Sequence, residues 1–344
     1  MRNSSISLVV VAIALSGCGS GPDGAGTSAP VPSGAEAFNP APPPAGYTRI
    51  TAATVKDVPP GGDVTYCQYV MPPLDHDVDV LAVSGYQSKF GHHAAAFVYT
   101  PQAGEEPGSN FPCMGTEFSS GGPDGGSSGG SLSMGTYLGA VAGADTGSPP
   151  AAMPEGVAFR LNKGNGVMLN VHYLNVGDKT IDGNAVVDLK LADTDPSRKI
   201  AAMFINLDTG FDLTAATEST SSVDCVAQTD LQLIMMSNHM HEFGTSALSE
   251  VRPAAGGPSE ELHRDTTWSF DMQFNPVFSK WDTEAPFLVH AGDTVRTTCN
   301  WDNTTAASMK FPREMCVGVA FALTTGDHPT VPMCANGQWI AAGL

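Results

Sequence analysis

Six side chains of types that bind transition metals lie in four short clusters of this chain. They are His92 and His93, His172, the alternating pair His239 and His241, and Met315. Only nine histidines occur in the 344 residues, so clusters that take up five of them are informative. Imidazole binds several transition metals, whereas a thioether is a soft ligand that favours Cu(I). An all-histidine set followed by a His, His, Met set indicates two copper sites, suited to one-electron and oxygen chemistry.

The second set lies on an alternating run from Leu231 to His241. Side chains at positions i and i+2 share one face of a strand, so His239 and His241 point the same way and can chelate one ion. The same parity predicts that Leu231, Leu233, Met235 and Ser237 lie on that face. Met315 and its neighbour Cys316 then face opposite ways, so the thioether can meet a metal while the thiol forms a disulfide.

The first set needs a distortion of the strand. In the run from Val167 to Tyr173, His172 shares a face with Met168 and Asn170. Adjacent residues such as His92 and His93 face opposite sides of a regular strand, so both reach one ion only at a bend or bulge, which Gly91 could supply. The remaining histidines show no cluster, and we interpret them as surface or loop residues: His76, His263, His290 and His328.

The periodicity of the chain favours strands over helices. Short alternating runs at 77–83, 167–173, 186–191, 231–241 and 315–323 are interrupted by turns rich in Gly and Pro. This pattern is typical of an all-β sandwich protein. A Gly/Ser-rich stretch at 119–133 predicts a surface loop. The polar stretch Asp193 to Lys199 predicts a linker between an N-terminal domain, 49–195, and a C-terminal domain, 196–344, with one metal set in each.

The N-terminus predicts export. Residues 1–18 combine Arg2, a short apolar run and Leu15-Ser16-Gly17-Cys18, which resembles a bacterial lipobox with Cys18 as the lipidated residue. An ordinary secretory signal is the alternative. A glycine rather than an aspartate follows Cys18, which favours the outer membrane. Residues 19–48 are rich in Gly, Pro and Ala and predict a disordered tether. The folded part would lie in the periplasm or at the cell surface, held to the membrane by the anchor alone.

Charge and cysteine content limit the partners. The formal net charge is -19 and no Lys/Arg-rich run occurs, which argues against nucleic acid as a partner. Six cysteines remain after Cys18, and an even number in an exported chain predicts disulfides, although spacing alone allows fifteen pairings. Thiolate copper ligands are the weaker alternative, because no cysteine adjoins a histidine cluster.

Six short sequence motifs occur in the same order as in the copper type II ascorbate-dependent monooxygenases. By these motifs the chain resembles that family, which includes the peptidylglycine α-hydroxylating and dopamine β-monooxygenases. The motifs are Thr65-Tyr66-Cys67, Gly91-His92-His93, Pro154-Glu155-Gly156-Val157-Ala158-Phe159-Arg160, Val171-His172-Tyr173, His239-Met240-His241 and Glu314-Met315-Cys316. Together they span about residues 60 to 335.

The resemblance implies two tandem jelly-roll-like antiparallel β-sandwich domains. It implies that His92, His93 and His172 hold an electron-transfer copper, which receives its electrons from ascorbate or a similar donor. It further implies that His239, His241 and Met315 hold the copper at which O2 and a small organic substrate react. The two sites would face each other across open solvent.

The resemblance also implies three disulfides, pairing Cys67 with Cys113, Cys225 with Cys334, and Cys299 with Cys316. The chain differs from the peptide-processing branch at the residues with which that branch binds the substrate carboxylate. Ser237 replaces an Arg, Val319 replaces a Tyr, and Asn170 stands in place of a Gln near the first site.

The sequence therefore predicts a copper-dependent monooxygenase that hydroxylates a C–H bond. A non-catalytic copper-binding lipoprotein for storage or delivery is the alternative, and a structural lipoprotein that lost its activity is a third. Storage proteins usually repeat Met or His ligands many times, whereas this chain has two sets of three. The sequence names neither the substrate nor the oligomeric state.

Overall fold

The computed structural model describes residues 38–101, 106–108, 110–112, 137–142, 148–175, 177–273, 276–311, 313–324 and 333–340. The predicted signal with Cys18, most of the tether, the 119–133 loop and His328 lie outside these residues. By its internal contacts the chain divides into residues 1–37 and 38–344. Among the described residues the only helical element is the short 3-10 turn η2 (Phe270–Gln273), so the all-β prediction is confirmed. None of the described residues forms a helix long and apolar enough to cross a membrane.

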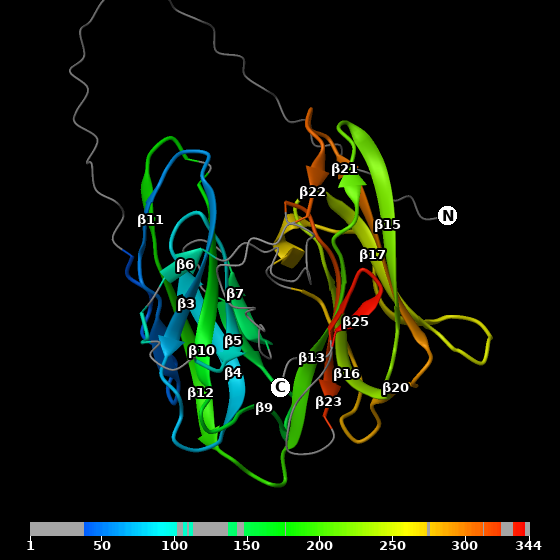
Figure 1. The fold of residues 1–344 in the computed structure, drawn as a ribbon, viewed down its shortest axis with the longest axis horizontal. Coiled ribbons are helices and arrows are strands. Elements are labelled where there is room, and N and C mark those ends of the chain that lie inside the picture. The colour runs from blue at the N-terminus through cyan, green and yellow to red at the C-terminus, as the bar shows by residue number, and fades with distance from the viewer. Residues whose placement is uncertain are drawn as a thin grey trace, which may run out of the picture. The chain divides into compact units, whose positions relative to one another are not determined.

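Within the described residues, twelve strands precede the predicted linker and thirteen follow it (Figure 1). The first twelve are β1 (Thr48–Thr51), β2 (Val55–Val58), β3 (Asp63–Met71), β4 (Val78–Gln87), β5 (Gly91–Tyr99), β6 (Asn110–Pro112), β7 (Tyr137–Ala142), β8 (Ser148–Ala152), β9 (Val157–Leu161), β10 (Gly166–Leu174), β11 (Ile181–Gly183) and β12 (Ala185–Asp193).

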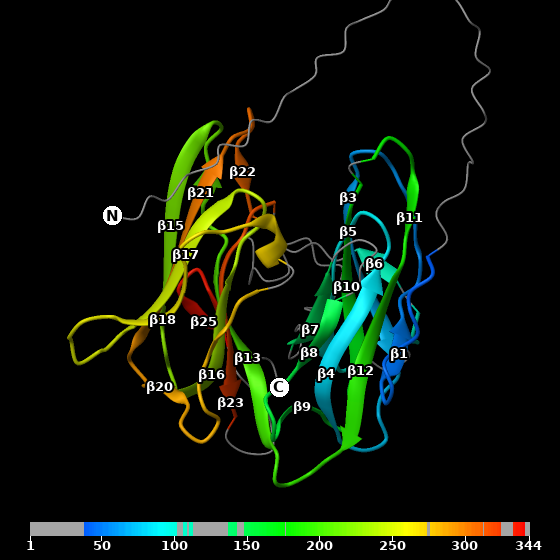
Figure 2. The same ribbon diagram turned by 180° about the vertical axis from the view of Figure 1, so that it is seen from behind.

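These strands build the first sandwich. One sheet has the order β6-β3-β10-β5-β7, and the other runs β1-β12-β4-β9 with β8 added to β4. Strands β1, β12 and β4 lie side by side in Figure 2. Val167, Leu169 and Val171 of β10 pack into the main core, whereas Met168 belongs to a separate cluster on the other face. The predicted division of β10 into two faces is therefore confirmed.

Thirteen strands follow the linker. They are β13 (Lys199–Asp208), β14 (Asp212–Leu213), β15 (Thr217–Val226), β16 (Leu231–His239), β17 (Gly244–Arg252), β18 (Glu260–Asp265), β19 (Ser279–Lys280), β20 (Phe287–Val289), β21 (Thr294–Asn303), β22 (Met309–Lys310), β23 (Cys316–Leu323), β24 (Met333–Ala335) and β25 (Gln338–Ile340).

The second sandwich packs the sheet that contains β13-β23-β16-β19 against the sheet β15-β21-β17-β18. Two disulfides cross-link it, Cys225–Cys334 and Cys299–Cys316. Both join the pairs that the resemblance predicts. Cys67 is also disulfide-bonded, but its predicted partner Cys113 lies outside the described residues.

The two sandwiches are joined by hydrogen-bonded strands and by apolar packing. β9 pairs antiparallel with β4 and parallel with β13, through Lys199 beside Val157 and Ile200 beside Ala158. The rings of Phe159 in β9 and Phe321 in β23 lie 5.6 Å apart between centroids. The main core of the first sandwich also includes Ile234 of β16. One end of the β16–β23 face is thus closed by apolar side chains.

One sequence prediction about β16 is wrong. A bulge between Leu233 and Met235 leaves Ile234 as an extra residue opposite β23. Leu231 and Leu233 pack inside the second sandwich, as does Met236 beyond the bulge, whereas Met235 packs toward the first sandwich. Because one added residue reverses the side-chain parity, His239 faces away from the core that holds Leu231 and Leu233.

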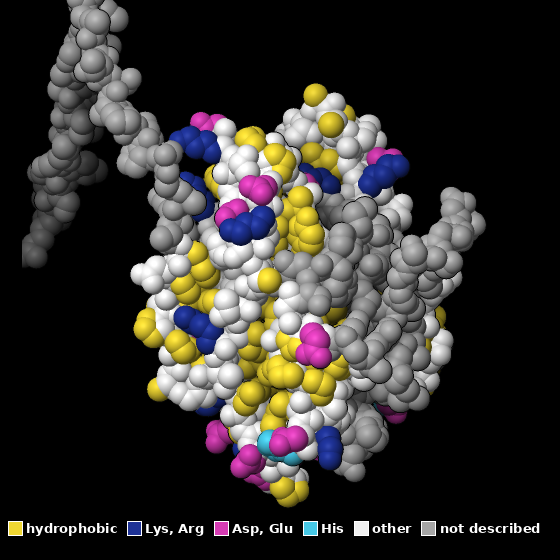
Figure 3. All heavy atoms as spheres, turned by 60° about the vertical axis from the view of Figure 1, so that its left-hand side comes forward, with side chains coloured by type: hydrophobic (Ala, Val, Ile, Leu, Met, Phe, Trp, Pro, Cys, Tyr) yellow, Lys and Arg dark blue, Asp and Glu magenta, His cyan; other side chains and the backbone are white. Residues whose placement is uncertain are grey.

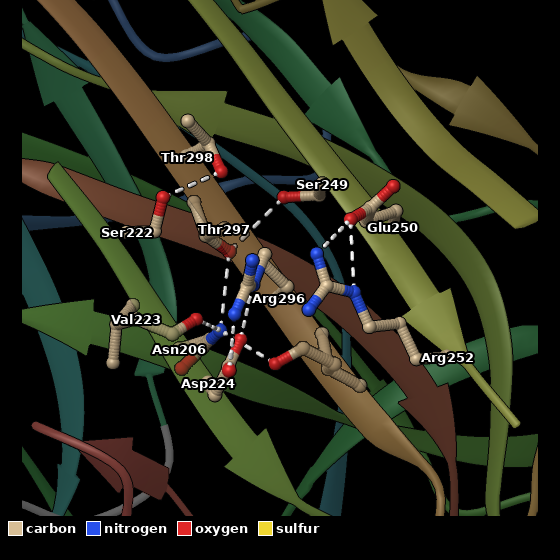
Figure 4. Close-up of polar contacts among 11 residues, drawn as sticks. Asn206, Ser222, Val223, Asp224, Ser249, Glu250, Arg252, Arg296, Thr297 and Thr298 are labelled. Carbon is tan, nitrogen blue, oxygen red and sulfur yellow. Dashed lines mark hydrogen bonds and ion pairs between the residues drawn. The ribbon is translucent and has the colours of Figure 1, made fainter. Parts of the chain in front are cut away.

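A buried polar chain crosses the interior of the second sandwich (Figure 4). Asn206 Nδ2 donates to Thr297 Oγ1, which contacts Ser249 Oγ, and Ser249 donates to Asn238 Oδ1. Asn238 Nδ2 donates in turn to Asp265. Gly318 makes room for this chain, because a Cβ there would lie 2.4 Å from Thr297 Oγ1. The hydrogen bonds of Asn238 therefore fix β16 at the residue next to His239.

Charged side chains on the face drawn in Figure 3 are scattered, often beside a residue of opposite charge, with hydrophobic side chains between them. One of the charged groups, Asp79, lies in the interior. The carboxylate of Asp79 is fully buried and receives Arg160 at 2.9 Å and Arg198 at 2.8 Å. Arg198 also donates to the carbonyl of Asp193, at the end of β12. This cluster holds the connection between the two sandwiches.

Asp79→Asn should lower the free energy of unfolding by about 3–5 kcal/mol, because it leaves two guanidinium groups without their buried counter-charge. Urea denaturation measures the loss. Asp182→Asn is the matched control, because the Lys56–Asp182 pair is much more exposed and such pairs contribute about 0–1 kcal/mol. Equal losses in the two variants would contradict the role given to Asp79.

Candidate copper centres

The first histidine set is assembled by a bulge in β5. His93 pairs directly with His172 of β10, whereas the next β10 residue, Tyr173, pairs with Gly91. His92 is therefore the extra residue of the bulge. Since a bulge changes the direction of neighbouring side chains, this is the distortion that the adjacent histidines were predicted to need. The side chain of His92 lies outside the described part of the structure.

Gly91 and Gln87 explain why the bulge lies where it does. The buried Gln87 amide donates to the backbone carbonyls of His93, at 2.9 Å, and His172, at 3.0 Å. A Cβ on residue 91 would lie 2.4 Å from Gln87 Cδ. Glycine at this position therefore lets one side chain tie together the two strands that carry His93 and His172.

The orientation of both rings is set by acceptors on their Nε2 atoms. The His93 and His172 rings are in edge contact, with centroids 5.2 Å apart. His93 Nε2 lies 2.9 Å from Asn170 Oδ1, and His172 Nε2 lies 2.6 Å from Asp63 Oδ1. A carboxylate and an amide oxygen only accept, so each neutral ring carries its proton on Nε2. The lone pair for a metal is then on Nδ1.

In the second set, His241 has the opposite arrangement. The rings of His239 and His241 lie 5.2 Å apart at an interplanar angle of 90°. His241 Nδ1 donates to the backbone carbonyl of Arg313 over 3.0 Å, which leaves the lone pair on Nε2. The predicted proximity of the two imidazoles is present, at the end of β16 and in the turn that follows.

The strand register next to this pair indicates where Met315 would lie. β16 and β23 pair antiparallel, with Ser237 opposite Val319 and His239 opposite Val317. Continuing that register places His241 opposite Met315, on the face that carries His239. Cys316 forms the predicted disulfide with Cys299, and the opposite orientation of Met315 stays a prediction.

Glu314 anchors the turn that carries His241. Its carboxylate is fully buried and accepts hydrogen bonds from the backbone N–H of His241 and Phe243 and from the indole of Trp301. Burial raises the pKa of Glu314, although these hydrogen bonds oppose that shift. Trp268 Nε1 donates to the His241 carbonyl over 2.8 Å. Both sides of the His241 backbone are therefore fixed.

Burial disfavours the protonated form of three candidate ligands. It lowers the pKa of His93, His239 and His241 to about 3, and charges on neighbouring histidines act in the same direction. The charge of His239 acts on His93, and those of His93 and His172 act on His241. The two sets therefore lie within electrostatic range of each other.

These residues fit copper. No group of three or more His, Cys, Asp or Glu side chains able to hold a metal occurs within the described part of the chain. Such a group would need His92 in the first set, and the third ligand of the second set is a thioether. The ring orientations set for His93, His172 and His241, together with the thioether predicted for the second set, match ligand types that copper accepts.

Sequence reasoning missed two residues and misplaced one. Asp63 and Glu314 contact the candidate ligands or their backbone, but neither follows from ligand spacing. His263 was interpreted as a surface or loop residue, which is wrong: it lies buried in β18, with Nε2 at 3.2 Å from Asp265 and Nδ1 at 2.9 Å from Ser279. The alternation of His263 with Asp265 is the signal that could have indicated a buried pair.

Comparison with protein-family models and with curated proteins gave no match. Among solved structures, the chain is similar to the major capsid protein P2 of bacteriophage PM2, with a TM-score of 0.35 and 7% identity over 82% of this chain and 99% of that chain. The infectious bursal disease virus Gx strain structure gives a TM-score of 0.20 and 10% identity, over 82% and 72%. These likenesses are too weak to carry an argument about function.

The metal-free protein should lose stability as the pH falls from about 6.5 toward 3. An unfolded histidine binds a proton near pH 6.5, whereas His93, His239 and His241 resist protonation in the folded state down to about pH 3. The unfolded state therefore binds more protons in this window, and stability is fully present only above it. Urea midpoints at pH 7.5 and 5.5 measure the effect.

His241→Asn should reduce this pH dependence, because it removes one of the buried groups. His290→Asn, at an exposed histidine outside both sets, should leave it unchanged. A difference between pH 7.5 and 5.5 that is the same in both variants would count against buried neutral ligands.

Proposed function

We propose that the protein is a copper-dependent monooxygenase that hydroxylates a C–H bond of a small organic substrate. It would use O2 and an external reductant such as ascorbate. The observation that carries the proposal is the pair of unlike ligand sets. One set offers imidazole Nδ1 atoms, and the other offers an imidazole Nε2 atom at His241 with a thioether beside it by register. Two copper ions would supply one-electron transfer and O2 activation.

The residues of the chain have separable roles in this proposal. His92, His93 and His172 would hold the first ion, with Asn170 and Asp63 orienting two of the rings. His239, His241 and Met315 would hold the second, with Glu314 fixing the backbone on which His241 lies. The apolar contact of Phe159 with Phe321 covers the other end of the β16–β23 face and would keep water from it.

The lipobox resemblance favours an anchor through Cys18 in a bacterial outer membrane, with the folded part in the periplasm or at the cell surface. An exported site would meet small molecules and O2 from the periplasm or the surroundings. Storage or delivery of copper is the competing proposal, and turnover separates the two.

The purified protein should bind two copper ions per chain and consume O2 with ascorbate in the presence of its substrate. His172→Ala should bind one ion and lose turnover, because it removes a ligand of the first set only. Metal analysis, O2 uptake and circular dichroism give stoichiometry, activity and fold. His290→Ala serves as the control and should keep both ions and full turnover.

A stoichiometry of one copper ion per chain in the unmodified protein would contradict the proposal of two sites. Two tightly bound ions without O2 consumption, across small amides, phenylethylamines and apolar compounds, would favour storage or delivery instead.

The face next to the second set indicates the kind of substrate. Ser237 and Val319, which replace the carboxylate-binding Arg and Tyr of the peptide-processing branch, lie opposite each other in the β16–β23 register. Ser237 is buried and its hydroxyl donates to the Asn238 carbonyl. The guanidinium groups of Arg313 and Arg252 are already paired, with Glu242 and Glu250 respectively. A carboxylate is best bound by an Arg fork, and none is offered here.

We therefore expect little turnover of a short apolar peptide that ends in glycine, and better turnover of the same peptide with its carboxylate amidated. The two compounds differ only in the charge that the missing Arg would bind. Product mass increased by one oxygen measures turnover. Faster hydroxylation of the free acid would show that another arginine, Arg313 or Arg252, binds the substrate carboxylate.

A further inference from the structure

Asp63 lies at the start of β3, beside the strand that carries His172. In the β3–β10 register Asp63 is opposite Leu174, and Thr65 is opposite His172. The Asp63 side chain therefore reaches diagonally to His172, the next position on that face of the sheet. Its Oδ1 lies 2.6 Å from His172 Nε2. The contact is made within the first sandwich, between two neighbouring strands.

This contact adds little to stability. About half of the Asp63 side chain is exposed (52%), and exposed ion pairs contribute little to folding. Its geometry nevertheless determines the chemistry of the ring, because the carboxylate accepts the Nε2 proton and holds the lone pair on Nδ1. Carboxylates in this position orient metal-binding histidines and increase their donor strength. Asp63 is also within range of the charges of Arg313 and His241.

We propose that Asp63 is a positioning residue for the first copper site, where its carboxylate fixes the His172 ring so that Nδ1 faces the metal. The inference rests on the proposed function, since it requires copper at this site, but it does not require a hydroxylation reaction. The negative charge beside the ring also favours Cu(II) over Cu(I) at the first site.

The test compares Asp63→Ala and Asp63→Asn in the full chain. Competition with a chelator should show Cu(II) affinity at the first site about 10–100-fold weaker in Asp63→Ala, with the second site unchanged. Asp63→Asn keeps an acceptor oxygen without the charge, so its affinity should be intermediate and its Cu(II)/Cu(I) potential more positive. In the metal-free protein, ¹⁵N NMR should show His172 protonated on Nε2 in the wild type and a mixture of tautomers in Asp63→Ala.

Asp75→Asn is the matched control. Asp75 contacts His76 at 2.5 Å in an exposed pair of the same chemical type, but His76 belongs to neither ligand set. This variant should leave both copper affinities and the first-site potential unchanged. A loss of affinity equal to that of Asp63→Asn would mean that overall charge, and not positioning, is responsible.

The outcomes separate this inference from the proposed function. Two bound ions with first-site affinity and His172 tautomer unchanged in Asp63→Ala would overturn the role of Asp63 and leave the copper sites standing. Weakened first-site binding without hydroxylation by any variant would support Asp63 and count against the reaction. A wild-type protein that binds no copper would overturn both.

Discussion

Strand register is the constraint on which both candidate sites depend. In the first sandwich, the pairing of His172 with His93 across β10 and β5 brings two imidazoles into contact. In the second, the pairing of β16 with β23 ends at His239 opposite Val317, and its continuation would bring His241 opposite Met315. A shift of one residue in either ladder would turn these side chains to the opposite face. The bulges at His92 and Ile234 both shift the side-chain parity that a regular strand would impose, and both candidate sites depend on that shift.

Buried polar groups keep these registers in place. Gln87 ties the backbone of His93 to that of His172, and Glu314 holds the turn that carries His241. Removing either side chain would leave buried N–H or C=O groups without partners, and such groups are costly. Polar burial near the ligands thus fixes the backbone, while the apolar cores of the sandwiches supply most of the driving force for folding.

The sequence predicted the architecture better than the details of the sites. Alternation located β4, β10, β12, β16 and β23, because a strand with one buried face leaves a period of two. Gly91 next to paired histidines indicated the bulge in β5. The bulge at Ile234 has no glycine and no break in hydrophobicity, so parity was carried through it and Leu231 and Leu233 were placed on the wrong face. Asp63 and Glu314 depend on contacts across strands that local patterns do not encode.

His93 and His172 use Nε2 to hydrogen-bond to the protein, whereas His241 uses Nδ1. This difference has a structural origin. His93 and His172 lie opposite each other on a sheet, where neighbouring side chains such as Asn170 and Asp63 can reach the outer Nε2 atoms. The lone pairs are then on Nδ1, nearer the backbone, which restricts the site to the sheet surface. His241 lies beyond the end of β16, where a backbone carbonyl accepts from Nδ1 and leaves the lone pair on Nε2. A carboxylate beside the first set would favour an oxidised ion, and a thioether in the second would favour a reduced one. If the proposed function holds, the two sites would therefore favour copper in unlike oxidation states, because strand position decides which acceptor each ring meets.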